Sequence, residues 1–354
     1  MARIVVHGAG AIGASVAYHL AFLGAREVVL ADSGEVAGGA TARAMGGIRQ
    51  QFSTPAEVVL ARESIRFFEG LGDRLFEQVG YLFLATTEAG LARLAERREV
   101  QAGLGVPVER VEPARVADLA PGVAADDVLG GVVCAEDGVA DPPAVTRELV
   151  RRAVERRVEV LERTPGEELD ADIRVLACGA ASAEAARPFG IELPVRPLVR
   201  QLFETSDLGG LPAGLPMVLE EETGFHFRRR GACLRVAMPD PAPRWRTDAT
   251  VDESLLPDRL ARLAHRYPAA RSAAVARAWA GLYDMTPDAH PLIGWVGEGI
   301  YAACGFSGHG FMQSPAVGRA VAEEIVAGAA SLDLAPYRPG RFAAGAVFPE
   351  EVVL

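Results

Sequence analysis

The stretch that decides the fold is residues 3–32, RIVVHGAGAIGASVAYHLAFLGAREVVLAD. Its apolar beginning, residues 3–7, predicts a short buried strand, and residues 27–31 predict a second one. Between them, residues 11–23 have the pattern of a helix that stops at Gly24. A strand, a glycine-rich turn, a helix and a strand in this order predict the βαβ unit that binds dinucleotides.

Three glycines in the turn, Gly8, Gly10 and Gly13, have the spacing GxGxxG. Gly8 permits the tight turn, Gly10 lets a pyrophosphate approach the backbone, and Gly13 lets the helix pack closely on the strand. Ala11 and Ile12 open the helix, so we expect their amides and the positive end of the helix dipole to face the phosphates.

The second strand ends at Asp32, which Ser33 follows. Asp32 lies 19 residues after Gly13, the spacing at which a carboxylate reaches a ribose hydroxyl. A carboxylate there disfavours a 2′-phosphate, so NADP is not expected. The alternative interpretation is an ordinary βαβ unit with a glycine-rich turn.

A second glycine-rich segment, residues 38–52 (GGATARAMGGIRQQF), stands where a nicotinamide-binding domain would continue with strand–helix units. It can bring Thr41 and Arg43 to a pyrophosphate and run the backbone of Gly46 and Gly47 along a longer cofactor. The alternative is a flexible surface loop.

Two later helix starts are also predicted. Thr54 has the features of an N-cap, with Pro55 in the first turn and Glu57 as its capping-box partner. Another helix is expected to begin near Pro315.

The composition is that of a globular chain with two domains or one large one. The 354 residues include 47 acidic and 36 basic ones, a net charge of −11 that argues against nucleic acid or an anionic membrane as the main partner. Every basic residue is Arg, and the chain contains no Lys and no Asn. A lysine Schiff base and a lysine general base are therefore excluded.

The four cysteines, Cys134, Cys178, Cys233 and Cys304, are far apart and form no CxxC pair. This spacing is typical of reduced, buried cysteines in a cytoplasmic protein, and it predicts no disulfide framework and no metal site. No uninterrupted apolar run is long enough to predict a membrane span.

Several motifs resemble the D-amino acid oxidase superfamily of FAD-dependent amine oxidases, in particular the branch of sarcosine oxidase β-type subunits and dye-linked L-proline dehydrogenase β subunits. They occur in order along nearly the whole chain. They are the N-terminal unit with residues 39–52, IRVLACGAAS at 173–182, the pair Arg200–Gln201, GLYDMTPD at 281–288 with PLIG at 291–294, and GFSGHGFM at 305–312.

The resemblance implies an α/β plus α+β fold with two interleaved domains. A Rossmann-like FAD-binding domain would be discontinuous, and a substrate domain built on a mostly antiparallel sheet would lie between its parts. The expected boundaries are 1–80, 140–190 and 281–330 for the FAD-binding domain, 81–139 and 191–280 for the substrate domain, and 331–354 for a C-terminal tail.

The resemblance also implies FAD as the cofactor. We expect it to be noncovalent, because Gly281 stands where some relatives carry a cysteine that bonds to the flavin. Further cofactor-binding residues implied by the matching motifs are Val160 on the adenine side, Cys178, Gly179, Gly281, Gly308, His309, Gly310, Phe311 and Met312.

In this family a hydride passes from the carbon beside the amine nitrogen to flavin N5, which gives an imine. The resemblance therefore implies oxidation of a small amine or amino acid, with secondary amines such as sarcosine or proline favoured over primary amino acids. A lysine that binds the substrate carboxylate in monomeric sarcosine oxidases is replaced by Met312.

Candidates for the substrate site follow from these motifs. Arg49 is the candidate for the carboxylate anchor, because a planar guanidinium suits a carboxylate; alternatively it contacts the flavin or backbone. Tyr283 would lie near the substrate or form an aromatic wall. His226 would donate to the substrate or be a buried core histidine, and Gln51 would read the substrate or line the site.

The electron acceptor is either O₂ or another molecule, which includes a partner subunit. Relatives that react quickly with oxygen often use a lysine near flavin N5, so we expect poor oxygen reactivity here. Two other functions remain open: a flavin-binding subunit or assembly factor with little activity alone, and an NAD-linked dehydrogenase.

Overall fold

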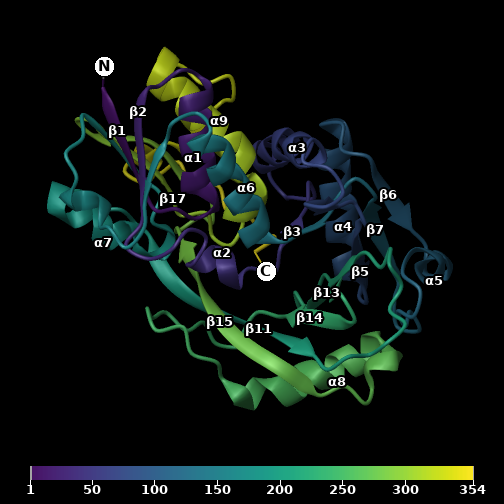
Figure 1. Cartoon of the computed structure of the whole chain (residues 1–354). Coiled ribbons are helices and arrows are strands. Elements are labelled where there is room, and N and C mark those ends of the chain that lie inside the picture. Colours follow the sequence, from purple (N-terminus) through teal and green to yellow (C-terminus); the bar gives the residue numbers. More distant parts are fainter. Residues whose placement is uncertain (1, 354) are drawn as a thin grey trace.

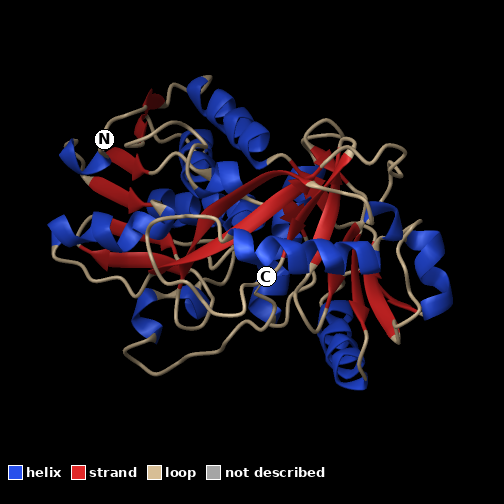
Figure 2. Cartoon of the chain, turned by 90° about the horizontal axis from the view of Figure 1, so that it is seen from below, coloured by secondary structure: helices blue, strands red, loops and turns tan. Residues whose placement is uncertain are grey.

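The computed structural model describes residues 2–353, which form two large β-sheets, one small sheet and the helices around them. Figure 2 shows the strands of the sheets between helices and long loops. No helix in this range is long and apolar enough to cross a membrane.

The first large sheet contains the N-terminal strand at its centre. Its strand order is β16-β17-β10-β1-β2-β9, parallel except for the antiparallel pair β16–β17. The strands are β1 (Arg3–His7), β2 (Glu27–Ala31), β9 (Glu159–Leu161), β10 (Ile173–Leu176), β16 (Leu292–Gly297) and β17 (Ile300–Cys304). Segments far apart in the chain thus build one sheet.

Helix α1 (Ala11–Phe22) packs beside α6 (Pro142–Val154) and α9 (Gly310–Ala327), as Figure 1 shows. Residues 11–20 of α1 are all buried, which explains why this helix is apolar on every side. A Cβ at Gly318 would overlap the side chain of Ser15, so the close crossing of α1 and α9 requires glycine there.

The predicted N-terminal unit is confirmed in β1, α1 and β2, whereas two details of later helices are wrong. α3 (Pro55–Glu69) begins after Thr54, but Glu57 forms no capping box. Glu57 is buried and instead pairs with His290 Nδ1 at 2.9 Å.

Helix α9 begins at Gly310, earlier than predicted, and Pro315 lies inside it. Pro315 has no N–H to donate to the carbonyl of Phe311, four residues before it. The hydroxyl of Ser314 donates to that carbonyl at 2.9 Å, which compensates for the missing bond.

The second large sheet is mostly antiparallel, as expected. Its order is β15-β11-β14-β13-β12-β5-β7-β6, and the β12–β5 pair is parallel. The strands are β5 (Tyr81–Ala85), β6 (Val108–Val111), β7 (Gly130–Cys134), β11 (Arg196–Thr205), β12 (Met217–Glu220), β13 (His226–Arg230), β14 (Cys233–Ala237) and β15 (Val275–Met285).

Helix α8 (Leu256–Arg266) covers one face of this second sheet, as Figure 1 shows. Leu263 of the helix belongs to the same buried cluster as Phe203 and Phe227 of the sheet. Side chains on a strand alternate between faces, so the neighbours of Phe203 on β11 point away from this core.

The remaining elements are short or peripheral. A small sheet contains β3 (Gly47–Ile48), β8 (Gly138–Ala140) and β4 (Phe76–Glu77), in that order. The remaining helices are α2 (Ala40–Arg43), α4 (Glu88–Gly103), α5 (Val116–Leu119) and α7 (Ser182–Ala186).

Candidate active site

A cavity of about 970 Å³ lies between the carboxyl ends of the parallel strands and the second large sheet. His7, Ala31 and Ala177 line it where β1, β2 and β10 end. Ligands of open α/β sheets bind beyond the carboxyl ends of the strands, so the position is that of a cofactor site.

Gly8 and Gly13 have the turn and packing roles that the sequence predicts. Gly8 has φ +99°, and a Cβ there would overlap the carbonyl oxygen of Ala177. A Cβ at Gly13 would overlap the carbonyl oxygen of Gly8, so Gly13 sets the close approach of α1 to the turn. Gly13 itself does not line the cavity, whereas Gly8 and Gly10 do.

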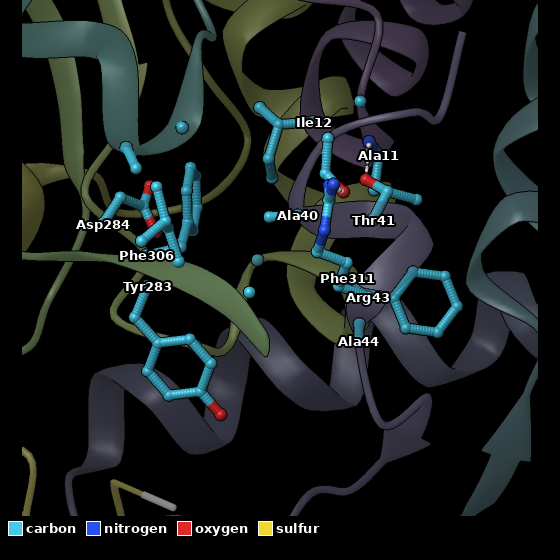
Figure 3. Close-up of a pocket in the computed structure, with 18 of the residues that line it drawn as sticks. Ala11, Ile12, Ala40, Thr41, Arg43, Ala44, Tyr283, Asp284, Phe306 and Phe311 are labelled. Carbon is cyan, nitrogen blue, oxygen red and sulfur yellow. Dashed lines mark hydrogen bonds between the residues drawn. The ribbon is translucent and has the colours of Figure 1, made fainter. Parts of the chain in front are cut away.

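The N-terminus of α1 meets the second glycine-rich segment. The hydroxyl of Thr41 accepts a hydrogen bond from the backbone N–H of Ala11 at 3.1 Å, and both residues line the cavity (Figure 3). Thr41 thereby fixes α2 against the N-terminal end of α1.

Asp32 organises the turn and also faces the cavity. Its carboxylate accepts hydrogen bonds from the backbone N–H groups of Ala9 and Gly34, each at 2.7 Å. A carboxylate has about four acceptor positions, so Asp32 can still accept from a ribose hydroxyl.

The opposite end of the cavity is built by the turn before α9. Gly308 has φ +95°, and a Cβ there would overlap the ring of Tyr283. The carboxylate of Asp284 accepts from the backbone N–H of Gly305 at 2.8 Å, which holds the turn against β15. The first residues of α9 therefore present a helix N-terminus to the cavity, a site suited to negative charge.

Burial shifts the pKa values of three groups at this end of the cavity. It lowers the pKa of His226 to about 4, although Nδ1 of that histidine bonds to the carbonyl of Gly224 at 2.7 Å. It lowers the pKa of His309 to about 3, to which the nearby Arg49 charge contributes. Burial raises the pKa of Asp284 to about 6. Both histidines are therefore neutral at pH 7.

Two arginines line the same end of the cavity, with different environments. Arg49 is buried, donates from Nη2 to the carbonyl of Val352 at 2.7 Å and from Nη1 to that of Gln51, and lies 4.0 Å from the ring centroid of Phe52. Arg200 has its guanidinium carbon 5.5 Å from the ring centroid of Tyr283. Within residues 2–353, the guanidinium of Arg200 forms no hydrogen bond or ion pair, and its Nε is buried without a partner.

The pleat of the second sheet places several residues of neighbouring strands on its cavity-facing side. Leu202 of β11 lies opposite Ala237, which lies opposite His226 on the next strand, and all three line the cavity. Arg200 is two residues from Leu202 on the same face and lies opposite Gly281, which has no side chain to cover it.

Most of the predicted site residues are brought together. Those that line the cavity are Gly8, Gly10, Ala11, Ile12, Asp32, Ser33, Thr41, Arg43, Gly46, Gly47, Arg49, Cys178, Gly179, His226, Gly281, Tyr283, Gly308, His309, Gly310, Phe311 and Met312. Figure 3 shows Tyr283 and Asp284 across the cavity from Thr41 and Arg43.

Three predicted residues do not line this cavity: Gly13, Gln51 and Val160. The side-chain amide of Gln51 donates to the carbonyl of Tyr81 at 3.1 Å and to Asp137 at 3.0 Å. Gln51 therefore holds Tyr81, which lines the cavity, without lining it itself. Val160 lines a separate pocket of about 430 Å³ between β9 and α6.

The sequence reasoning also missed residues that line the cavity. The sequence places Arg200 only in a motif; the signal that could have found it is its two-residue spacing from Leu202, which puts both side chains on one face of a strand. Phe306 lies within the motif at 305–312 but is not among the predicted site residues. Tyr81 and Met217 give no signal, because apolar side chains in strands are usually core residues.

The fold and the cavity are those of a dinucleotide-binding protein, in which a second, mostly antiparallel sheet lines the end of the cavity away from the glycine turn. The model of the FAD dependent oxidoreductase (DAO) family matches residues 3–324. The chain therefore belongs to this family, and it is an FAD-dependent oxidoreductase.

Individual relatives agree with this assignment. The bovine (Bos taurus) FAD-dependent oxidoreductase domain-containing protein 1 is 29% identical over 99% of this chain and 87% of its own. Glycine oxidase from Geobacillus kaustophilus is 25% identical over 94% of this chain and 95% of its own. The structure of L-proline dehydrogenase from P. horikoshii superposes with a TM-score of 0.91 at 28% identity, and covers 98% of this chain and 99% of its own.

The residues present fit FAD. The glycine turn and the N-terminus of α1 suit the pyrophosphate, and Asp32 at the end of β2 suits the ribose. The cavity continues past Arg43 to the N-terminus of α9, so it accommodates a group larger than a mononucleotide. Among residues 2–353, no cluster of His, Cys, Asp or Glu is arranged to bind a metal ion.

Proposed function

We propose that this protein oxidises the C–N bond of a small amine that carries a carboxylate, with a secondary amino acid such as sarcosine or proline favoured. The observation that carries the proposal is the positive charge beside Tyr283 at the end of the cavity, contributed by Arg49 and Arg200. Neither arginine forms an ion pair with a carboxylate in residues 2–353, so both charges are available to an anionic ligand.

In this proposal, Arg200 is the residue that mainly binds the carboxylate of the substrate. Arg49 already donates to two carbonyl groups, whereas the guanidinium of Arg200 forms no hydrogen bond within the described chain. The ring of Tyr283 holds the guanidinium of Arg200 by a cation–π contact. The N–H groups of the guanidinium remain free to donate two parallel hydrogen bonds to a carboxylate. Arg49 then adds charge to the same end and lines the wall.

FAD, when bound noncovalently, supplies the hydride acceptor for this chemistry, at flavin N5. The chain contributes the environment. Low pKa values keep His226 and His309 neutral, so they add no charge that would repel the ammonium form of an amine. The N-terminus of α9 stabilises negative charge at its end of the cavity.

The names of the relatives support an amino acid substrate. Glycine oxidase, L-proline dehydrogenase and 4-methylaminobutanoate oxidase from Paenarthrobacter nicotinovorans each denote an amine that also carries a carboxylate. The last of these is 24% identical to this chain and has about twice its length, since the match covers 45% of that protein.

A comparison of L-proline with pyrrolidine tests this proposal, because the two differ only in the carboxylate. With an artificial electron acceptor, kcat/KM should be at least about tenfold higher for L-proline, because charge-assisted hydrogen bonds contribute about 1.5–3 kcal/mol. The same comparison for sarcosine and dimethylamine tests acyclic substrates. Equal values for both members of both pairs would contradict a carboxylate site.

A flavin-binding subunit with little activity of its own is the second candidate. It is favoured by the absence of lysine, in particular by Met312 at the position of the lysine that binds carboxylate in some relatives. The electron acceptor in that case would be a partner subunit. No turnover with any amine, together with normal FAD content, would favour this candidate.

A further inference from the structure

Residues 348–352, here named the C-terminal strap, cross from the turn before β16 to the wall of the cavity. The ring of Phe348 stacks on His290 with a centroid distance of 4.3 Å, and its carbonyl accepts from His290 Nε2 at 2.6 Å. The backbone N–H of Glu350 donates to the carbonyl of Asp288 at 3.0 Å. In Figures 1 and 2 the C-terminal end of the chain lies near the centre of the molecule.

Glu350 fastens the strap to the beginning of α3. Its side chain is 4% exposed, and its carboxylate accepts from the backbone N–H groups of Ser53 at 3.0 Å and Thr54 at 3.2 Å. Burial opposes its charge, but the backbone N–H of Val352 and the nearby Arg49 charge help to hold the pKa of Glu350 below its ordinary value. A carboxylate at a helix N-terminus is also stabilised by the helix dipole.

The carbonyl of Val352 joins two residues that line the cavity. It accepts from Arg49 Nη2 at 2.7 Å and from His309 Nε2 at 3.2 Å. A carbonyl oxygen can only accept, so His309 carries its proton on Nε2. One backbone atom of the strap thus connects the segment before α3 with the turn before α9.

Arg49 depends on the strap for much of its stabilisation. Its side chain is 1% exposed, and burial lowers its pKa, which the nearby Tyr81 and Glu350 partly offset. A buried charge without partners is costly, so loss of Val352 and Glu350 would let the guanidinium leave its place in the wall.

We propose that the C-terminal strap is a positioning device for the active site. It holds Arg49 and His309 in the cavity wall, and its detachment weakens carboxylate binding through Arg49. Glu350 is the positioning residue that keeps the strap in place. The effect on ligands rests on the proposed function, since it assumes a ligand with a carboxylate.

A double-mutant cycle separates this role from a general structural one. The variants are Arg49→Met and a truncation after Pro349, alone and combined, in FAD-loaded protein. Acetate is the probe, and its Kd is read from the change in the visible spectrum of the flavin. Each single change should raise the Kd by about tenfold, which corresponds to about 1.4 kcal/mol. The Kd of the double variant should be no more than about 20-fold above that of the wild-type protein, because both changes remove the same interaction.

A second cycle with Arg200→Met is the matched control. Arg200 forms no hydrogen bond, ion pair or cation–π contact with residues 348–352, so its effect and that of the truncation should multiply to about 100-fold. Multiplication in the Arg49 cycle as well would overturn the proposal. If the truncated chain does not fold, Glu350→Gln replaces the truncation, with the exposed neighbour Glu351→Gln as its control.

The urea midpoint is the second readout for the same variants. The combined shift for Arg49→Met and the truncation should be smaller than the sum of the two single shifts. If the wild-type protein binds no acetate, the carboxylate part of the proposed function fails, and the urea cycle still tests the strap. Additive urea shifts would then overturn the strap proposal as well.

Discussion

Replacement of Arg200 by methionine removes the guanidinium and keeps a side chain of similar length. Arg200 has no ion-pair partner in residues 2–353, so the change leaves no buried carboxylate unpaired. The loss within the protein is the cation–π contact with Tyr283, which contributes about 0.5–1 kcal/mol at an accessible site. We therefore expect a small change in stability and a large one in ligand binding.

The size of the binding effect follows from the hydrogen bonds that Arg200 offers. Hydrogen bonds to charged groups contribute about 1.5–3 kcal/mol, and about 1.4 kcal/mol corresponds to a factor of ten. The KM for L-proline should rise by about 10- to 150-fold in Arg200→Met. The KM for pyrrolidine should change little, because this amine has no carboxylate.

Arg196 provides the matched control for this experiment. It lies on the same strand and the same face, its guanidinium carbon is 4.6 Å from the ring centroid of Trp245, and it does not line the cavity. Arg196→Met should leave both KM values unchanged. An unchanged KM for L-proline in Arg200→Met, or an equal increase for pyrrolidine, would refute the reasoning. A loss of bound FAD would instead assign Arg200 to the cofactor.

Three further predictions concern the cofactor, pH and oxygen. Gly13→Ala should abolish FAD binding, because the added Cβ would overlap the carbonyl oxygen of Gly8. Gly103→Ala is the control: a Cβ there meets no other atom, so this variant should bind FAD normally. The visible absorbance of the purified proteins measures FAD binding in both. Burial lowers the pKa of His226 in the folded protein to about 4, so the unfolded chain takes up a proton at this histidine at a higher pH than the folded protein does. The free energy of unfolding therefore falls as the pH drops from the ordinary histidine pKa toward 4. Linkage gives a loss of about 2 kcal/mol between pH 7 and 5, and urea unfolding of His226→Gln should show a correspondingly smaller loss. Reduced enzyme should reoxidise slowly in air, because the chain has no lysine; stopped-flow reoxidation as fast as that of an efficient oxidase would contradict this.

The cofactor end of the site could be predicted from sequence because its determinants are local. Gly8, Gly13 and Asp32 act within one βαβ unit, where spacing along the chain fixes spacing in the fold. The structure places Gly8 and Asp32 at the cavity and gives Gly13 the packing role that the motif requires.

The substrate end depends on contacts between distant segments, which single-sequence patterns do not encode. Glu57 fits a capping box by local spacing, but the fold places it beside His290, and the buried ion pair prevails. The sequence favours Arg49 as the carboxylate anchor, with a contact to the flavin or backbone as the alternative; in the structure its guanidinium donates to the carbonyl of Val352, a residue 303 positions away. Local spacing gives no indication of either partner.

Anaerobic mixing of the FAD-loaded protein with a panel of amines tests the central claim most directly. The panel contains sarcosine, L-proline, glycine and D-alanine, together with pyrrolidine and dimethylamine as partners without a carboxylate. The account predicts loss of the oxidised flavin absorbance with at least one secondary amino acid, and much weaker loss with its partner amine. No bleaching by any member of the panel, from a protein with full FAD content, would contradict it.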